Sequence, residues 1–202
     1  MTSNKVVVPG VRDVRGSLDV PDGETDGVIV ACPPHPQFDG NRNDNRLVAL
    51  SEYLTDHGVA CLRFDYGDWD EGYGEREDAR NAMRFARERY DSVGIFGFSF
   101  GGAIATLAGV DENADVIALL APASRLTDDL DAAAALDDVE VPLKVLYGTR
   151  DDLADWEPLV ERADELGFET EEFPADHFFI GQEQKVANRL GEFLVARLES
   201  PA

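Results

Sequence analysis

The sequence of 202 residues has few lysines, cysteines and histidines, and it has no apolar run long enough to cross a membrane. Only Lys5, Lys144 and Lys185 are lysine among 18 basic residues, against 41 acidic ones, so the formal charge is -23. Such a charge repels nucleic acids and anionic membranes, and we expect neither as a partner. The longest apolar run, residues 116–123, is too short for a membrane helix, and because residues 1–15 have no sustained apolar segment before a small-residue cleavage site, we expect no signal peptide there. We therefore expect a soluble, cytoplasmic protein.

An acidic, lysine-poor composition is typical of proteins that work in concentrated salt. At molar ionic strength the Debye length falls to about 3 Å, so the repulsion between surface carboxylates is screened. The apolar fraction of 44% is that of an ordinary globular protein. The sequence therefore predicts an acidic surface and a halophilic cytoplasm; the alternative is a merely acidic mesophilic protein.

The two cysteines exclude a disulfide framework and a cysteine-based metal site. Cys32 and Cys61 lie in apolar, strand-like runs, and their spacing matches neither a metal motif nor a redox pair. We expect both to be buried free thiols, and we expect no metal ion.

Strand-like apolar runs alternate with helical patterns through the middle of the chain. Strands are expected at residues 5–8, 16–20, 27–32, 59–64, 93–98, 115–121, 141–147 and 168–173, and helices at residues 45–57, 75–89, 100–109, 157–166 and 182–198. The first two strands are expected to form an antiparallel edge. The proline-rich residues 33–40 are expected to form neither a helix nor a strand. The alternation predicts an α/β fold with a mostly parallel sheet covered on both faces, in a single domain of residues 1–202.

The chain is organised around residues 93–105. An apolar strand runs into Gly97-Phe98-Ser99-Phe100-Gly101, and small residues with helical spacing follow. A Gly-x-Ser-x-Gly turn between strand and helix holds the serine in a strained conformation, with its hydroxyl above the end of the sheet. Ser99 is therefore the candidate nucleophile, whereas an ordinary glycine-rich turn with a solvated serine is the alternative.

A serine hydroxyl needs a neighbouring base to become a nucleophile, and the chain has three histidines. His57 is expected to cap a helix end, and His35 lies in the proline-rich turn. His177 follows the last predicted strand, at the edge of the sheet where ligands bind in such folds. We therefore predict His177 as the general base.

The base needs an acid to orient it, and that acid should follow a strand between the serine and the histidine. Asp151, directly after the strand at residues 141–147, is the first choice, and Asp152 remains open. Asp176 is next to His177 in sequence and so is badly placed to orient it. The resulting order of serine, acid and histidine is the one expected for this architecture.

Acyl chemistry also needs backbone N–H groups for the oxyanion. One is predicted to be the amide of Phe100, directly after the serine. The other should come from the loop at residues 33–40, where the prolines have no N–H, leaving His35 or Gln37. We favour His35, since it lies nearer the strand; a proline turn without a catalytic role is the alternative.

Taken together, these motifs resemble the α/β-hydrolase superfamily, and most closely its small, nearly capless members related to dienelactone hydrolases. The resemblance covers residues 28–194 and rests on residues 34–40, Asn43-Asp44-Asn45, residues 62–67, the turn at residues 97–102, Gly148-x-x-Asp151 and residues 176–179. It implies an eight-stranded, mostly parallel sheet, no metal or organic cofactor, and Ser99, Asp151 and His177 as a catalytic triad. Two departures lie near the site: Pro33 replaces a histidine of the family, and Tyr66-Gly67-Asp68-Trp69-Asp70 replaces an Arg-Gly and serine loop.

The sequence therefore predicts a serine hydrolase that cleaves a carboxylic ester of a small molecule through an acyl-enzyme. The segment at residues 123–141 is short for a cap and indicates an open cleft. Aromatic side chains that could line this cleft are Phe38, Tyr66, Trp69, Phe98 and Phe178. The alternatives are a thioesterase or peptidase with the same triad, because the serine turn does not fix the leaving group, and a binding or scaffold protein without turnover.

Overall fold

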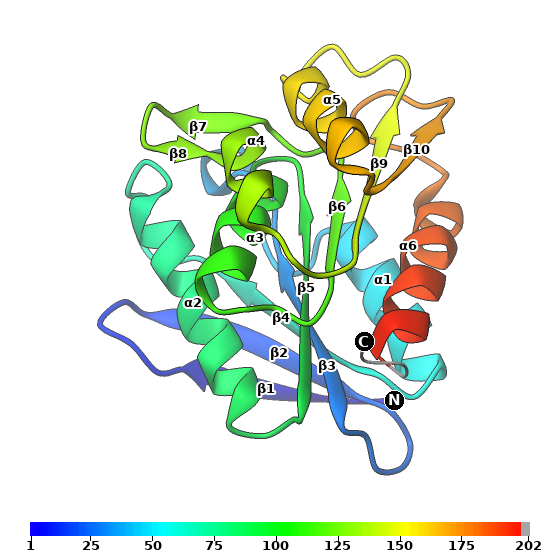
Figure 1. The fold of residues 1–202 in the computed structure, drawn as a ribbon. Coiled ribbons are helices and arrows are strands. Elements are labelled where there is room, and N and C mark those ends of the chain that lie inside the picture. The colour runs from blue at the N-terminus through cyan, green and yellow to red at the C-terminus, as the bar shows by residue number, and fades with distance from the viewer. Residues whose placement is uncertain (199–202) are drawn as a thin grey trace.

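The computed structural model describes residues 1–198 and contains an eight-stranded sheet in the order β1-β2-β4-β3-β5-β6-β9-β10. Its strands are β1 (Thr2–Val8), β2 (Val14–Val20), β3 (Gly27–Cys32), β4 (Ala60–Asp65), β5 (Ser92–Phe98), β6 (Ile117–Leu120), β9 (Leu143–Gly148) and β10 (Glu169–Phe173). All neighbours are parallel except β1 with β2 and β2 with β4. The mostly parallel sheet and its antiparallel edge are confirmed, and the carboxyl ends of the parallel strands meet at the top of Figure 1.

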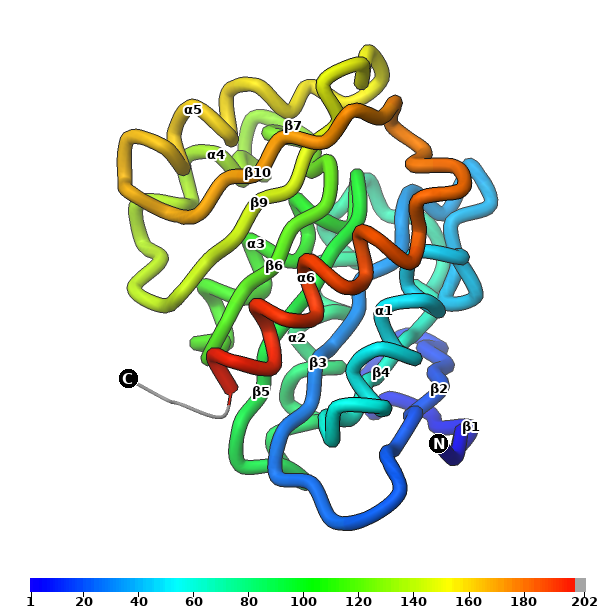
Figure 2. The backbone as a smooth tube through the Cα atoms, turned by 90° about the vertical axis from the view of Figure 1, so that its right-hand side faces the viewer, coloured from blue at the N-terminus to red at the C-terminus, as the bar shows by residue number. Residues whose placement is uncertain are grey.

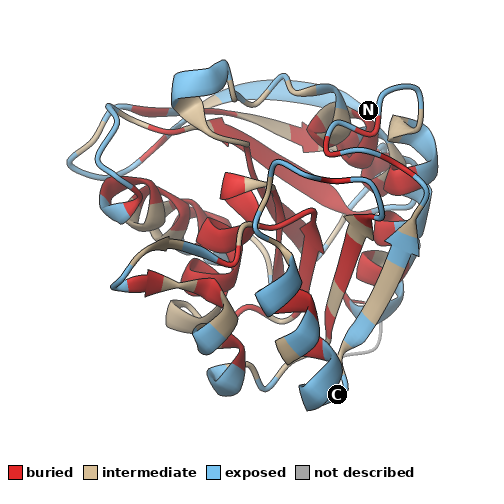
Figure 3. Ribbon diagram, turned by 90° about the horizontal axis from the view of Figure 1, so that it is seen from above, coloured by how far each residue is buried: buried red, intermediate tan, exposed pale blue. Residues whose placement is uncertain are grey.

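Helices cover both faces of this sheet, as predicted for strands that are buried on both sides. They are α1 (Asn45–Asp56), α2 (Tyr73–Arg87), α3 (Phe100–Asp111), α4 (Ala132–Ala135), α5 (Glu157–Leu166) and α6 (Glu183–Leu198). Helices α1 and α6 pack side by side on one face, and α2, α3 and α5 lie on the other (Figures 1 and 2). Viewed from above, the central strands are buried, whereas the edge strands β1 and β10 and the outer sides of the helices are mostly exposed or partly exposed (Figure 3).

Two hydrophobic cores, one on each face, follow from the alternation of side chains along the strands. On β3, Val28, Val30 and Cys32 face the core beneath α2 and α3, whereas Ile29 and Ala31 face the core beneath α1 and α6. A continuous apolar run such as residues 27–32 is therefore what a central strand requires.

The two cysteines are both free and buried, as predicted. Cys32 belongs to one core and Cys61, on β4, to the other, so the sheet separates the two thiols. Burial raises the pKa of Cys61 to about 12 and raises the pKa of Cys32 further. No helix within residues 1–198 is long and apolar enough to cross a membrane.

Three local expectations need correction. Residues 33–40 contain one 3₁₀ turn, η1 (Pro36–Phe38), in which proline takes the first position, where its missing N–H has no cost. Helix α2 begins at Tyr73, two residues before the predicted start, because Glu75 accepts a hydrogen bond from the amide of Gly72. The segment between β6 and β9 forms a hairpin of β7 (Arg125–Thr127) and β8 (Leu130–Asp131), then α4 and the turn η2 (Leu136–Asp138).

Candidate active site

Ser99 lies between β5 and α3 with a backbone φ of 57° and ψ of -122°. Residues other than glycine rarely adopt a positive φ, and such strain persists only where the surroundings fix the backbone. Here the amide of Ser99 donates to Leu120 O at 2.9 Å, and its carbonyl accepts from Gly102 and Ala123 at 2.8 and 3.1 Å. The sharp turn predicted from the sequence is present, and the Ser99 side chain is partly exposed.

Glycines allow the close approach of the segments around this turn. A Cβ at Gly97 would overlap the carbonyl of Gly101, and a Cβ at Gly101 would overlap the carbonyls of Cys32 and Pro33. The glycines before and after Ser99 therefore let α3 approach β5 and the loop after β3.

The structure brings His177 and Asp151 to Ser99 from two separate loops. His177 Nε2 lies 2.9 Å from Ser99 Oγ, and His177 Nδ1 lies 2.7 Å from Asp151 Oδ2. The other carboxylate oxygen of Asp151 accepts the amides of Leu153 and Ala154 at 3.0 and 3.2 Å. An ionised carboxylate only accepts hydrogen bonds, so Nδ1 carries the imidazole proton and the Nε2 lone pair faces the serine.

The remaining candidate acids and histidines lie elsewhere. Asp152 is exposed and makes no hydrogen bond to His177, so of the two aspartates left open Asp151 is the one that contacts the imidazole. Asp176 accepts the amide of Phe178 at 3.0 Å. His57 follows α1, and its ring stacks on Tyr53.

The two amides predicted for the oxyanion lie in segments that touch each other. The rings of His35 and Phe100 are 4.9 Å apart, and α3 begins at Phe100. The amide of Gln37 donates to His35 Nδ1 at 3.2 Å. No acceptor in residues 1–198 takes the amide of His35 or Phe100, so both are available to a ligand, whereas the Gln37 amide is engaged.

The five aromatic residues proposed for the cleft divide into two groups. Phe38, Trp69 and Phe178 are exposed beside His35 and His177. Tyr66 and Phe98 are buried: the Tyr66 hydroxyl donates to Pro33 O at 3.2 Å, and the Phe98 ring lies 5.2 Å from that of His177. These two rings support the loops of the site from beneath rather than forming its surface.

The loop that follows β4 is anchored by two buried carboxylates that the sequence reading missed. Glu75 accepts the amides of Asp70 and Gly72 at 3.0 and 2.8 Å, and Asp78 accepts that of Gly67 at 2.9 Å. Both carboxylates are fully buried. Burial raises the pKa of Asp78, an effect that the Gly67 amide and Arg12 oppose. An acidic residue three positions after the glycine that precedes a helix was the available signal for Glu75.

Arg12, from the β1–β2 turn, completes this anchor. Its Nε donates to both oxygens of Asp78 at 2.9 and 3.0 Å, its guanidinium lies 3.7 Å from Glu75, and it also donates to Asp68 O. The loop therefore holds Trp69 in a defined position, with its ring stacked 4.5 Å from that of His35.

The loop that carries His177 is anchored differently. Phe179, with a backbone φ of 51°, is fully buried in the core beneath α1 and α6. Arg46 of α1 donates to Phe178 O at 2.7 Å, while its guanidinium lies 4.4 Å from the centre of the Phe98 ring. Arg46 was also missed, because no local pattern links it to residue 178.

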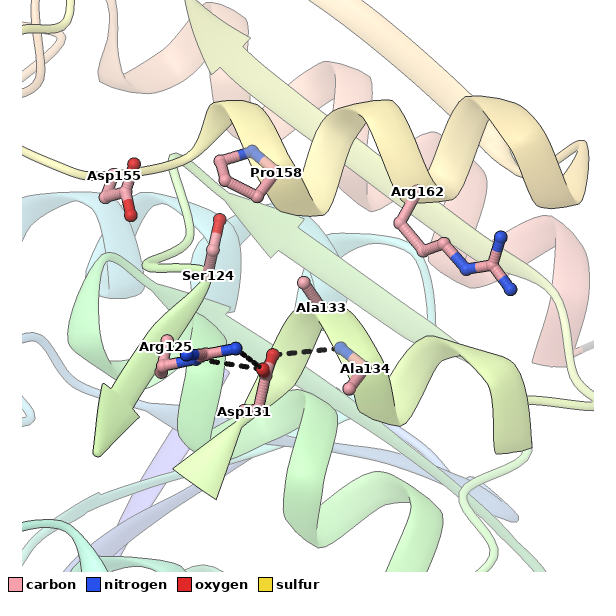
Figure 4. Close-up of a pocket in the computed structure, with 8 residues that line it drawn as sticks. All are labelled: Ser124, Arg125, Asp131, Ala133, Ala134, Asp155, Pro158 and Arg162. Carbon is pink, nitrogen blue, oxygen red and sulfur yellow. Dashed lines mark hydrogen bonds and ion pairs between the residues drawn. The ribbon is translucent and has the colours of Figure 1, made fainter. Parts of the chain in front are cut away.

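A separate cavity of about 460 Å³ lies between α5 and the β7–β8 segment (Figure 4). Its lining residues are Ser124, Arg125, Asp131, Ala133, Ala134, Asp155, Pro158 and Arg162. Arg125 is paired with Asp131, and Arg162 with Asp137 and Glu165. Both arginines of the cavity are thus engaged in ion pairs, and neither Ser99 nor His177 lines it.

Comparison with solved structures gives close matches over nearly the whole chain. An α/β serine hydrolase homologue from Coxiella burnetii has a TM-score of 0.82 at 24% identity, covering 96% of this chain and 98% of its own. A serine hydrolase without a lid from Xanthomonas campestris has a TM-score of 0.80 at 21% identity, covering 99% and 96%. A dienelactone hydrolase from Anabaena variabilis has a TM-score of 0.75 at 21% identity, covering 98% of each chain.

Comparison of the sequence with family models and with curated proteins gives one partial match. No family model matches the chain. An uncharacterized protein of Rickettsia prowazekii is 31% identical over 88 residues, which cover 39% of this chain. The match spans 37% of that protein's own length. The sheet order, the serine turn and the structural matches together give this protein the α/β-hydrolase fold.

Proposed function

We propose that this protein is a serine hydrolase that cleaves a carboxylic ester of a small molecule through an acyl-enzyme. The observation that carries the proposal is the continuous chain of hydrogen bonds from Ser99 Oγ through His177 to Asp151. Solvent reaches the serine, while the other two side chains are largely buried. This geometry suits proton transfer from a hydroxyl to an imidazole during attack on a carbonyl.

Each residue has one role in the proposed reaction. His177 accepts the Ser99 proton as Oγ attacks the carbonyl carbon, and then gives that proton to the departing alcohol. Asp151 holds the ring in the required tautomer and stabilises the imidazolium. A water molecule, deprotonated by His177, then attacks the acyl-enzyme and releases the acid and free serine.

The backbone supplies the proposed oxyanion site. The amides of His35 and Phe100, which have no acceptor within residues 1–198, donate to the negative oxygen of the tetrahedral intermediate. Helix α3 begins at Phe100, so the positive end of its dipole stabilises the same charge. The structural relatives include serine hydrolases and a dienelactone hydrolase, which supports acyl hydrolysis as the reaction class.

The first test is labelling by a fluorophosphonate together with turnover of short p-nitrophenyl esters in molar KCl. We expect Ser99→Ala to abolish labelling and to lower kcat/KM on the order of 10⁴-fold, because it removes the nucleophile. Ser92→Ala, at the other end of β5, is the matched control and should retain both. Labelling that survives Ser99→Ala would contradict the proposal.

The same preparation tests the alternatives. Parallel assays of an ester, a thioester and an amide with one common acyl group rank the leaving groups, and a thioester or amide preferred over the ester would reassign the activity. A folded protein that neither reacts with the probe nor hydrolyses any of the three substrates would instead be a binding or scaffold protein.

A further inference from the structure

The exposed aromatic side chains of the protein are not scattered over its surface. Within residues 1–198 they are Phe38, Trp69, Tyr73 and Phe178, and all four follow the carboxyl ends of β3, β4 or β10. We call these four residues the aromatic rim. Single exposed apolar residues need no explanation, but Phe38, Trp69 and Phe178 lie beside His35 or His177 on a protein whose formal charge is -23.

Two members of the rim, Trp69 and Phe38, pack on the imidazole of His35 and form a wall beside the proposed oxyanion site. Trp69 stacks on His35 with centroids 4.5 Å apart, and Phe38 packs on the same imidazole at 4.9 Å. Trp69 is only 36% exposed, and its loop is held by Glu75, Asp78 and Arg12 as described above. Burying two carboxylates is costly unless they are fully paired, so this loop is held in place by a dedicated network.

The chemistry of this wall points to an uncharged, planar group. The wall offers ring faces and edges, and burial lowers the pKa of His35, which favours the neutral imidazole. Exposed acids flank it at Asp39, Asp70 and Glu71. A carboxylate placed there would be repelled, whereas an aromatic ring would stack.

The position of the wall selects one part of the substrate. Around the tetrahedral carbon, the oxyanion points to the two amides and the leaving group points to His177, which must protonate it. Phe178 lies beside His177, at 5.4 Å between ring centres, whereas Trp69 and Phe38 lie beside His35. The group that remains for the wall is the acyl group.

We propose that Trp69 and Phe38 form the acyl-binding subsite of this enzyme and that it takes an uncharged aromatic acyl group. The proposal rests on the proposed function and narrows it to a substrate class. Trp69 and Phe38 act here as specificity-determining residues, since neither contacts the hydrogen-bonded chain of Ser99, His177 and Asp151.

The kinetic test uses substrates with one leaving group and different acyl groups: p-nitrophenyl acetate, phenylacetate and hemisuccinate. The unmodified protein should prefer the phenylacetyl ester and turn over the anionic succinyl ester most slowly. In Trp69→Ala and in Phe38→Ala, the phenylacetyl to acetyl ratio of kcat/KM should fall about tenfold, mainly through KM. Leu166→Ala, which removes a side chain at the end of α5 that is about as exposed as Trp69, should leave that ratio unchanged.

The Phe38→Ala variant should fold normally, because the Phe38 side chain is 81% exposed and its removal leaves no cavity. A changed ratio in this variant therefore cannot be attributed to misfolding. A ratio unchanged in both variants overturns the proposal even if all three esters are hydrolysed. So does a preference for the succinyl ester.

A binding test separates this proposal from the proposed function. Ser99→Ala protein is titrated with neutral phenylacetamide while tryptophan fluorescence is recorded. The part of the fluorescence that is missing in the double variant Ser99→Ala/Trp69→Phe is assigned to Trp69. We expect a saturable change in that emission with phenylacetamide and a dissociation constant at least tenfold weaker for the phenylacetate anion. If no ester is hydrolysed, this titration still tests the subsite proposal. No change in Trp69 fluorescence with phenylacetamide, or equal affinity for phenylacetamide and the phenylacetate anion, would overturn that proposal.

Discussion

Two loops at the same edge of the sheet hold the site by different physical means. The β4 loop, residues 67–72, carries Trp69 and is fixed by buried charge: Glu75, Asp78 and Arg12 bind its amides and a carbonyl. The β10 loop, residues 174–181, carries His177 and is fixed by apolar burial of Phe179. Arginines that donate to its carbonyls add to this anchor.

The two anchors differ in how narrowly they fix the geometry of the loop. Hydrogen bonds to buried carboxylates have narrow geometry, so the β4 loop is held at defined distances, and loss of one partner leaves donors unsatisfied. Apolar burial is not directional, so Phe179 retains its loop against the core while the hydrogen bonds to Ser99 and Asp151 set the orientation of His177. Variants in the two loops should therefore fail in different ways.

The largest effect is expected for Phe179→Ala in the β10 loop. It empties a fully buried site and should lower the free energy of unfolding by about 4 kcal/mol. Turnover should fall as well, because His177 loses its support. Urea unfolding in molar KCl measures the change, and Phe179→Leu, which keeps most of the volume, should lose less than half as much. Equal losses in the two variants would mean that packing is not the anchor.

A smaller effect with a different signature is expected for Glu75→Gln in the β4 loop. The amide keeps the shape but offers one acceptor to the two N–H groups of Asp70 and Gly72, and it loses the attraction to Arg12. We expect about 2–3 kcal/mol of lost stability. Trp69 emission should shift, and it should not shift in Phe179→Leu. Glu71→Gln, an exposed acid of the same loop, is the control; an unchanged Trp69 signal in Glu75→Gln would contradict an anchoring role.

The same contrast explains how much of the structure the sequence could predict. The serine turn, the strand ends and α5 follow from local patterns, and α5 was predicted with the bounds that the structure gives. The proximity of His177 and Asp151 to Ser99 could be predicted because each follows a strand of a parallel sheet, where topology alone brings residues together. The β10 loop was thus largely predictable.

The anchor of the β4 loop was not predictable in this way. Arg12 and Asp78 are 66 positions apart in the sequence. The same holds for one contact of the β10 loop, where Arg46 binds the carbonyl of a residue 132 positions away. In a chain with 41 acidic residues, the glycine three positions earlier was a local signal for Glu75, but no pattern marks Asp78 as buried and paired here. The short β7–β8 hairpin was missed for another reason: strands of three and two residues are too short for a period to show.

A third variant tests whether charge contributes to the β10 loop as well. Arg46 donates to Phe178 O and covers the Phe98 ring, so Arg46→Ala should lower stability by about 1–2 kcal/mol. Arg46→Lys keeps the charge but loses the planar fork, and it should recover only part of the loss. Full recovery with lysine would show that charge alone, without the geometry of the guanidinium, holds this carbonyl.

The smallest effect is expected for Arg150→Ala, which removes the second arginine on the β10 loop. Its guanidinium donates to Pro174 O at 2.9 Å from an exposed position, where solvent competes for the same carbonyl. We expect a loss of about 0.5 kcal/mol at most and little change in turnover. A loss as large as that of Arg46→Ala would mean that the β10 loop is held by its arginines, as the β4 loop is held by its carboxylates. The two loops would then differ only in the sign of the charge that anchors them.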